Sequence, residues 1–98
     1  MSLTLPDIEK HSMADQMRRS SKSIPANLAE GFGKRASHKE FCRYVYITIG
    51  SADEMRVWLR YCRDLGYIEE RQWQDWRQEY QEIVKMLVEL GKRLNQAN

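Results

Sequence analysis

The side chains best placed for chemistry form a polar stripe beside a proline. Ser23, Asn27 and Glu30 recur about one turn apart around Pro25, so they would share one face of a helix. A hydroxyl, an amide and a carboxylate so aligned could stabilise a helix kink, hold a ligand, or take part in catalysis. We expect the first, a structural network, and keep the other two as alternatives. A buried Glu30 would need a basic partner, for which the candidates are Arg18, Arg19 and Lys34.

A cluster of basic residues surrounds this stripe and the turn that follows it. Both an ordinary solvated surface and a surface that contacts phosphates would explain the cluster. Aromatic side chains that could stack on single-stranded bases are poorly interleaved with it, since Phe32 is the only one close by. The formal net charge is only +2, too small to identify nucleic acid as the partner. The basic cluster consists of Arg18, Arg19, Lys22, Lys34, Arg35, Lys39 and Arg43.

Patterns for metal binding and nucleophilic catalysis do not occur in the sequence. His11 and His38 are the only histidines, and there is no Glu-x-x-His pair, Cys-x-x-Cys pair, Gly-x-Ser-x-Gly elbow or glycine-rich phosphate loop. Cys42 and Cys62 lie in one predicted helix, about 30 Å apart at the usual rise per residue, which is too far to bridge. We therefore expect reduced thiols, no metal, no cofactor and no enzymatic activity.

Three helical segments position these groups in one domain, residues 1–98. The first, about 8–33, is expected to kink at Pro25, which removes a backbone hydrogen bond; the hydroxyls of Ser20, Ser21 and Ser23 could bond the freed carbonyls. The second, 37–65, begins with a capping box in which Ser37 caps Glu40 and Glu40 reaches back. It should end at Gly66 in a left-handed conformation. The third covers residues 69–95.

The apolar residues indicate how these helices pack. The third segment carries a heptad seam from Trp73 to Leu94, which predicts one buried face. We expect Trp58, Trp73 and Trp76 in the core. The middle segment has a seam from Phe41 to Cys62 and, in addition, a second flank, so it should touch at least two neighbours. The second flank, our candidate oligomer interface, consists of Tyr44, Ile47, Trp58 and Leu65.

The sequence also restricts where the protein works. No apolar run approaches the roughly 18 residues that a membrane span needs, and Met1–Leu5 has neither the basic nor the apolar region of a secretory signal. We therefore expect a cytoplasmic protein that does not enter a membrane.

A long stretch of the first segment resembles a known family. Gln16–Arg19 and then Ser23-Ile24-Pro25-Ala26-Asn27-Leu28-Ala29-Glu30-Gly31-Phe32-Gly33 are similar to the pattern of the S23-type 23S rRNA intervening-sequence proteins. The likeness continues in order and spacing through Lys39-Glu40-Phe41, residues 46–51 and Leu65-Gly66-Tyr67-Ile68, and so spans roughly residues 13–94. Within this stretch, the structural motif consists of Ser23, Pro25, Asn27, Glu30 and Gly31.

The resemblance implies a fold and a type of function. Members are all-α, antiparallel up-and-down four-helix bundles that assemble as ring-like pentamers, and no enzymatic activity is attached to them. A distant relative, the accessory protein of diversity-generating retroelements, associates with reverse transcriptase and RNA. The family usually has a further helix of about six turns before the Gln-x-Arg-Arg segment, and only Met1–Ser12, with Pro6, stands there in this chain. We therefore expect the first family helix to be missing. Arg56 and Trp58 replace the acidic or amide residues more usual at their positions.

We therefore expect a non-enzymatic homo-oligomer, a pentamer by resemblance or a dimer if the short N-terminus removes the ring contacts. RNA or a ribonucleoprotein is the expected partner of the basic cluster. The alternative is a protein-only assembly module whose apolar flank docks a partner protein and which has no nucleic-acid ligand.

Overall fold

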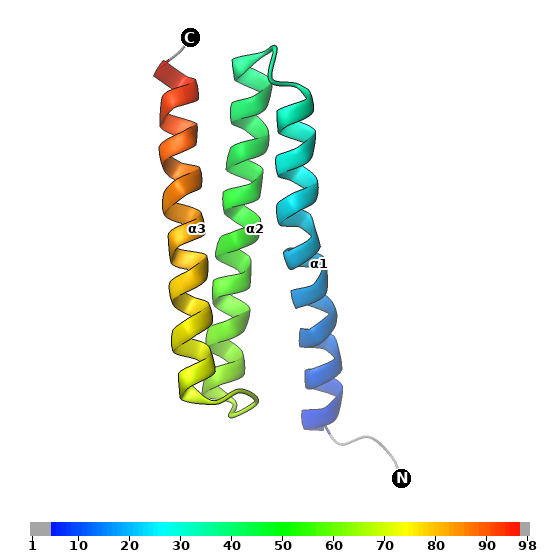
Figure 1. The fold of residues 1–98 in the computed structure, drawn as a ribbon. Helices are drawn as coiled ribbons and strands as arrows, with labels where there is room; N and C mark the ends of the chain where they lie inside the picture. Colours follow the sequence, from blue (N-terminus) through cyan, green and yellow to red (C-terminus); the bar gives the residue numbers. More distant parts are fainter. Residues whose placement is uncertain (1–4, 97–98) are drawn as a thin grey trace.

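The computed structural model describes residues 5–96, with side chains for residues 10–96. Three helices follow one another in this part of the chain: α1 (Leu5–Gly33), α2 (His38–Asp64) and α3 (Glu70–Gln96). They run up, down and up, joined by short turns (Figure 1). The predicted all-α, up-and-down fold is confirmed. The expectation of a missing first family helix concerns Met1–Ser12, of which Met1–Thr4 lie outside the described residues.

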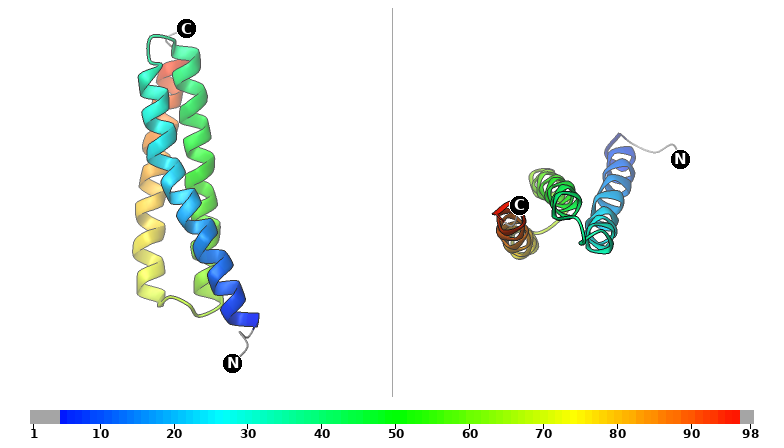
Figure 2. Two further views of the ribbon diagram at one scale, coloured as in Figure 1. Left: turned by 90° about the vertical axis from the view of Figure 1, so that its right-hand side faces the viewer. Right: turned by 90° about the horizontal axis from the view of Figure 1, so that it is seen from above.

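The three helices form an open layer, with α2 in the middle. α2 packs against α1 on one side and α3 on the other, and among the described residues no Cα atom of α1 lies within 8 Å of a Cα atom of α3. Seen along the helices, α2 stands between its two neighbours (Figure 2, right). The layer measures 57 × 26 × 13 Å. The middle segment therefore has the two neighbours that its wide apolar face predicts, but these helices do not close a four-helix core.

α1 continues through Pro25 without interruption. Of the three serines expected to bond backbone carbonyls around the proline, Ser21 donates to the Arg18 carbonyl at 3.0 Å. Ser20 and Ser23 instead bond side chains of α2, those of Glu54 and Ser51. The expectation was wrong for these two because their hydroxyls face the neighbouring helix, where cross-helix partners lie within reach.

Both ends of α2 are capped, though the N-terminal capping box is only half formed. The Ser37 hydroxyl accepts a hydrogen bond from the Glu40 amide at 3.2 Å. The amide of Ser37 is already bonded to the Lys34 carbonyl at 3.0 Å, so Glu40 does not reach back and its carboxylate binds Arg43 at 3.0 Å. The prediction that the Glu40 side chain bonds the Ser37 amide is therefore wrong.

The C-terminal end of α2 is a Schellman motif. Gly66 has a φ of +76°, as predicted, a conformation in which a Cβ atom would be strained. The amide of Tyr67 donates to the Cys62 carbonyl at 2.8 Å, and that of Gly66 to the Arg63 carbonyl at 3.0 Å. These bonds satisfy the last carbonyls of α2 and turn the chain toward α3.

The core lies along the face of α2 that both neighbours cover. Val45 and Thr48 are completely buried and Leu59 is 2% exposed. The Thr48 hydroxyl is satisfied within the helix by the Tyr44 carbonyl at 2.8 Å. On α3, only Leu87, Gly91 and Leu94 are buried, so the predicted heptad seam is covered only in its C-terminal half.

The prediction that all three tryptophans belong to the core is wrong. Trp58 and Trp73 are half-buried, and Trp76 is 38% exposed. Nothing from α1 reaches the first turns of α3, so a seam with helical periodicity stays open to solvent there. None of the helices in the described part of the chain is both long and apolar enough to cross a lipid bilayer.

Candidate functional site

The polar stripe of α1 packs against α2 as a hydrogen-bonded seam. The hydroxyls of Ser23 and Ser51 lie 2.7 Å apart. The Asn27 amide donates to the Ser23 hydroxyl at 2.8 Å and to the Ser23 carbonyl at 2.9 Å. These groups satisfy one another across the interface, and no buried side-chain nitrogen or oxygen of the described residues lacks a partner. The arrangement suits the structural role better than ligand binding or catalysis.

A second polar pair extends this seam by about one turn. Ser20, which is 5% exposed, donates to the Glu54 carboxylate at 2.8 Å. The Trp58 indole nitrogen donates to the same oxygen at 3.3 Å. Sequence reasoning missed Glu54 and Ser51, because only the packed helices bring them to the serines of α1. The small residues Gly50-Ser51-Ala52 were the available signal for a close helix approach.

Glu30 is not part of the seam. Its side chain is exposed, and no hydrogen bond or ion pair links it to Arg18, Arg19, Lys34 or any other described residue. The polar network expected of Ser23, Asn27 and Glu30 therefore does not include Glu30, because this residue lies on a part of α1 turned away from α2. Pro25 is also exposed, whereas Gly31 is buried.

Because Ser23 is bonded in the seam and Glu30 is exposed, alanine substitutions at the two positions should have different effects on stability. Glu30→Ala should change the free energy of unfolding by less than about 0.5 kcal/mol, as for other surface positions. Ser23→Ala should lower it by about 1 kcal/mol or more, because Asn27 and Ser51 lose a partner in the interface. Urea denaturation of the two variants beside the unmodified protein checks both values. A large loss in Glu30→Ala would mean that this carboxylate has a partner outside the described chain.

Most of the basic cluster gathers at the turn between α1 and α2. We call Lys34, Arg35, Lys39 and Arg43 the turn-end group. Lys34 lies 5.0 Å and Arg43 4.6 Å from the centre of the Tyr44 ring, and Arg35 lies 4.2 Å from that of Phe32. Cation–π contacts of this kind restrain the cations at the surface.

Carboxylates neutralise this group only in part. Within residues 10–96, its one ion pair joins Arg43 to Glu40 at 3.0 Å. The hydrogen bond from Arg43 and its positive charge hold the pKa of the Glu40 carboxyl below its ordinary value, and the same bond raises the pKa of Arg43. Among the described residues, no carboxylate lies within ion-pair distance of the other three cations.

The rest of the basic cluster lies elsewhere on α1. Arg18, Arg19 and Lys22 are exposed, and Arg18 pairs with Asp15 at 3.3 Å. Arg19 precedes Lys34 by fifteen residues, which is about 22 Å along a helix. The structure thus divides the predicted cluster into two basic areas.

The second flank lies where α1 and α2 meet, and α1 covers part of it. Tyr44 and Trp58 are half-buried, whereas Ile47 is 39% and Leu65 44% exposed. Tyr61, which the sequence did not single out, is 55% exposed beside them. A shallow hollow of about 250 Å³ opens here, lined by Ser12, Met13, Trp58, Tyr61 and Leu65.

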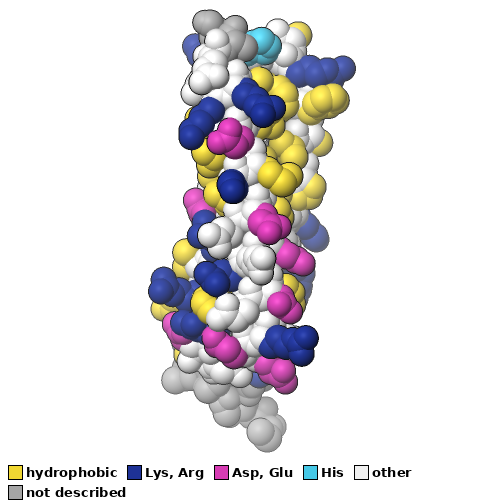
Figure 3. Space-filling view, turned by 60° about the vertical axis from the view of Figure 1, so that its left-hand side comes forward, with side chains coloured by type: hydrophobic (Ala, Val, Ile, Leu, Met, Phe, Trp, Pro, Cys, Tyr) yellow, Lys and Arg dark blue, Asp and Glu magenta, His cyan; other side chains and the backbone are white. Residues whose placement is uncertain are grey.

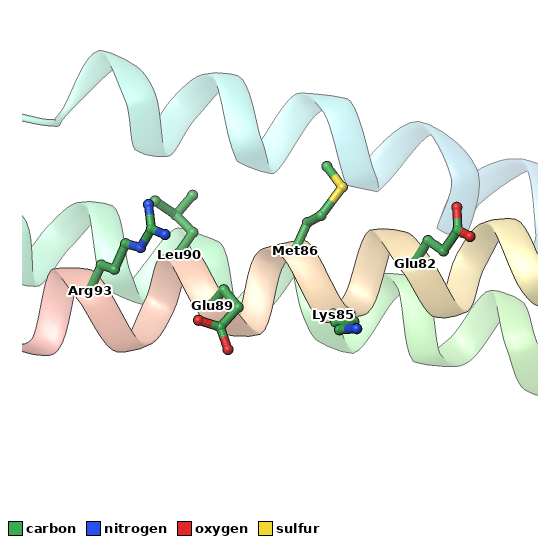
Figure 4. A pocket seen from close by; sticks show the side chains of 6 residues that line it. All are labelled: Glu82, Lys85, Met86, Glu89, Leu90 and Arg93. Atoms are coloured by element: carbon green, nitrogen blue, oxygen red, sulfur yellow. The ribbon is translucent and has the colours of Figure 1, made fainter.

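A second apolar strip runs along α3. In the space-filling view, hydrophobic side chains gather beside α3 in the upper half of the molecule (Figure 3). A hollow of about 520 Å³ opens on this helix. Figure 4 shows Met86 and Leu90 pointing from α3 toward the side of α1. Met86 is 69% exposed, and charges of both signs line the hollow from Glu82, Lys85, Glu89 and Arg93.

Sequence reasoning also missed an arginine-rich hollow between α2 and α3. It measures about 430 Å³ and is lined by Asp53, Arg56, Val57, Arg60, Trp73 and Arg77. The available signal was the spacing of three and four residues between Arg56, Arg60 and Arg63, which puts them on one helix face. Which helix faces them could not be read from that spacing.

Groups that could perform metal or thiol chemistry are sparse in residues 10–96. No three His, Cys, Asp or Glu side chains there come together as a metal site. Cys42 and Cys62 are free and buried. Burial raises the pKa of the Cys62 thiol, whose sulfur lies 3.7 Å from that of Met17. The thiol thus stays protonated at neutral pH and is a poor nucleophile.

Comparisons with known proteins identify a family but no individual relative. No curated protein and no solved structure matches the chain. The family model described as "23S rRNA-intervening sequence protein" matches residues 1–89. This match covers all three helices up to the last turns of α3, including the seam, the turn-end group and the second flank. The chain therefore belongs to the 23S rRNA-intervening sequence protein family.

Proposed function

We propose that the protein is a non-enzymatic, homo-oligomeric accessory factor of an RNA or ribonucleoprotein in the cytoplasm, and that the basic cluster contacts RNA phosphates. The observation that carries the proposal is the turn-end group. Four exposed cations stand together at one end of the layer, and within the described part of the chain a single carboxylate pairs with one of them. The three cations without an ion pair, Lys34, Arg35 and Lys39, can release the counterions of a phosphate backbone without first breaking a bond to a carboxylate.

Assembly is the second part of the proposal. Large apolar side chains are exposed on both sides of the layer, and identical chains usually associate with closed symmetry. The second flank is the interface that we propose, extended by Tyr61. A pentamer is the arrangement implied by family resemblance, and a dimer is the alternative.

Replacing Arg18, Arg19, Lys34 and Arg35 with glutamine tests the RNA contact. The variant should bind single-stranded RNA more weakly, and the slope of log affinity against log salt should become shallower by about 2 to 3, since each lost phosphate contact removes about 0.7. Fluorescence anisotropy of a labelled RNA over a salt series measures both quantities.

The matched control removes four cations from α3 instead: Arg71, Lys85, Lys92 and Arg93. All four are exposed, so the net charge changes equally while the basic cluster stays intact. We expect the control to keep most of the affinity. If the unmodified protein shows no RNA affinity at low salt, RNA is not its ligand.

The alternative, a protein-only assembly module, has its own supporting observation. Val57 is 57% exposed and Met86 69% exposed, and these residues lie outside the second flank. In that case, a pull-down from the native host with this protein as bait would recover a protein partner. Nuclease treatment would leave that partner bound.

A further inference from the structure

We propose that the arginine-rich hollow between α2 and α3 is a second phosphate site, which binds the backbone of the same RNA strand as the turn-end group. The inference rests on the proposed function, because it assumes that RNA is the ligand. It adds a site at the other end of α2, built from residues outside the basic cluster: Arg56, Arg60 and Arg77, with Asp53, Val57 and Trp73.

The arginine-rich hollow carries more positive than negative charge. Its three guanidinium groups outnumber its single carboxylate by two charges. Asp53 pairs with Arg56 at 3.0 Å, and Arg77 donates, among the described residues, only to the neutral amide oxygen of Gln74 at 3.1 Å. Arg60 is exposed, and no described carboxylate lies within ion-pair distance of it. Two guanidinium groups are therefore free to bind anions.

Trp73 helps to hold the arginines in place. The guanidinium of Arg63 lies 4.0 Å and that of Arg77 5.1 Å from the centre of its ring. Arg63 is fixed on its other side by Asp64 at 2.8 Å. Restraining side chains before the ligand arrives lowers the entropy lost on binding. We therefore assign Trp73 a positioning role, because guanidinium groups already lie against the ring that a base would need for stacking.

The chemistry of the hollow favours phosphodiesters. A guanidinium presents a rigid fork of donors that matches the oxygens of a phosphate. Each phosphodiester carries one negative charge, so two free guanidinium groups suit two phosphates. Figure 3 shows basic side chains around hydrophobic ones at the lower left, near the α2–α3 turn, on a surface open to solvent.

The position of the hollow favours a strand over a small anion. Arg60 follows Arg43 by seventeen residues, about 25 Å along the axis of α2. A single ligand that touches both sites must be elongated and must carry charge along its length. With one phosphate per 3.4 Å, as in one strand of a duplex, the span corresponds to about eight nucleotides.

The test compares Arg60→Gln/Arg77→Gln with the control Arg71→Gln/Arg93→Gln, which removes equal charge from exposed positions outside the hollow. Binding of a labelled single-stranded RNA of about 20 nucleotides is followed over a salt series. Loss of two phosphate contacts should make the salt slope shallower by about 1.4, whereas the control should change little. Arg60→Gln alone should give about half that change, and it leaves the contact of Arg77 with Trp73 in place.

The outcomes separate the two proposals. If the unmodified protein binds RNA and the cluster variant weakens binding, but the hollow variants match the control, then the second site is disproved and the proposed function stands. If the unmodified protein does not bind RNA at low salt, both fail. A slope that changes only in the hollow variants would disprove the role of the basic cluster and, with it, the proposal that one strand joins the two sites.

Discussion

Gly31→Ala is expected to lower the free energy of unfolding by about 1 to 3 kcal/mol, the usual cost of forcing an extra group into a packed interface. A Cβ atom on Gly31 would lie 2.7 Å from the Cβ of Tyr44 and 3.2 Å from the Cδ1 of Phe41. The first of these atoms cannot move without its backbone, so α1 and α2 would have to separate. The gain in helix propensity from alanine, up to about 1 kcal/mol, opposes only part of this loss.

Gly50→Ala is the matched control for that prediction. Gly50 also lies inside a helix, but no atom lies within 4 Å of an added Cβ. The control should therefore raise the free energy of unfolding by up to about 1 kcal/mol. Urea denaturation of both variants at one protein concentration compares them directly. Equal shifts of the same sign would show that α1 and α2 do not approach closely at Gly31.

Charging the second flank should have the largest effect on assembly. In the double variant Tyr61→Glu/Leu65→Glu, two exposed apolar groups of the proposed interface become carboxylates. Burying each large side chain contributes about 1.5 to 3 kcal/mol, so losing both should weaken association by at least about 100-fold. Size-exclusion chromatography with light scattering should then show a smaller species than the unmodified protein forms.

The control for this variant is Gln78→Glu/Gln81→Glu, which adds the same number of carboxylates to exposed positions on α3. It should leave the oligomeric state unchanged. If both variants dissociate, general charge repulsion and not the second flank accounts for the change. If neither does, the assembly uses another surface, for which the α3 strip around Met86 and Leu90 is the candidate.

Local features of the fold could be read from the sequence because they depend on neighbouring residues. The Ser37 cap and the left-handed Gly66 follow from the conformations that helix ends require. The wide apolar face of α2 likewise predicts two neighbours. The half-formed capping box shows the limit of this reasoning, because the Ser37 amide bonds the Lys34 carbonyl in the preceding turn.

The site was less predictable because its groups meet across helices. A stripe on α1 suggested that Ser23, Asn27 and Glu30 act together, but the rotation of α1 against α2 buries the first two partly and exposes the third. Periodicity likewise placed Trp76 in a seam that α1 does not cover. Rules that depend on neighbouring residues do not predict which two of the three helices fail to pack against each other.

The open layer connects the fold with the proposed function. A closed bundle of one chain would cover its apolar strips and have no need of partners. Here α2 is covered on two sides, while Tyr61, Val57 and Met86 stay more than half exposed. If copies of the chain cover these surfaces, the turn-end groups of several chains recur in one assembly, and an RNA strand could contact more than one of them.

Sedimentation equilibrium at micromolar concentration tests most directly the claim that several copies of the chain assemble. The chain has a mass of 11.7 kDa, and we predict an assembly with at least twice that mass, whose melting temperature rises with protein concentration. A pentamer would agree with the family resemblance, and a dimer with the alternative. A well-folded monomer, with cooperative melting that is independent of concentration, would contradict the claim and show that the open layer is stable without other copies.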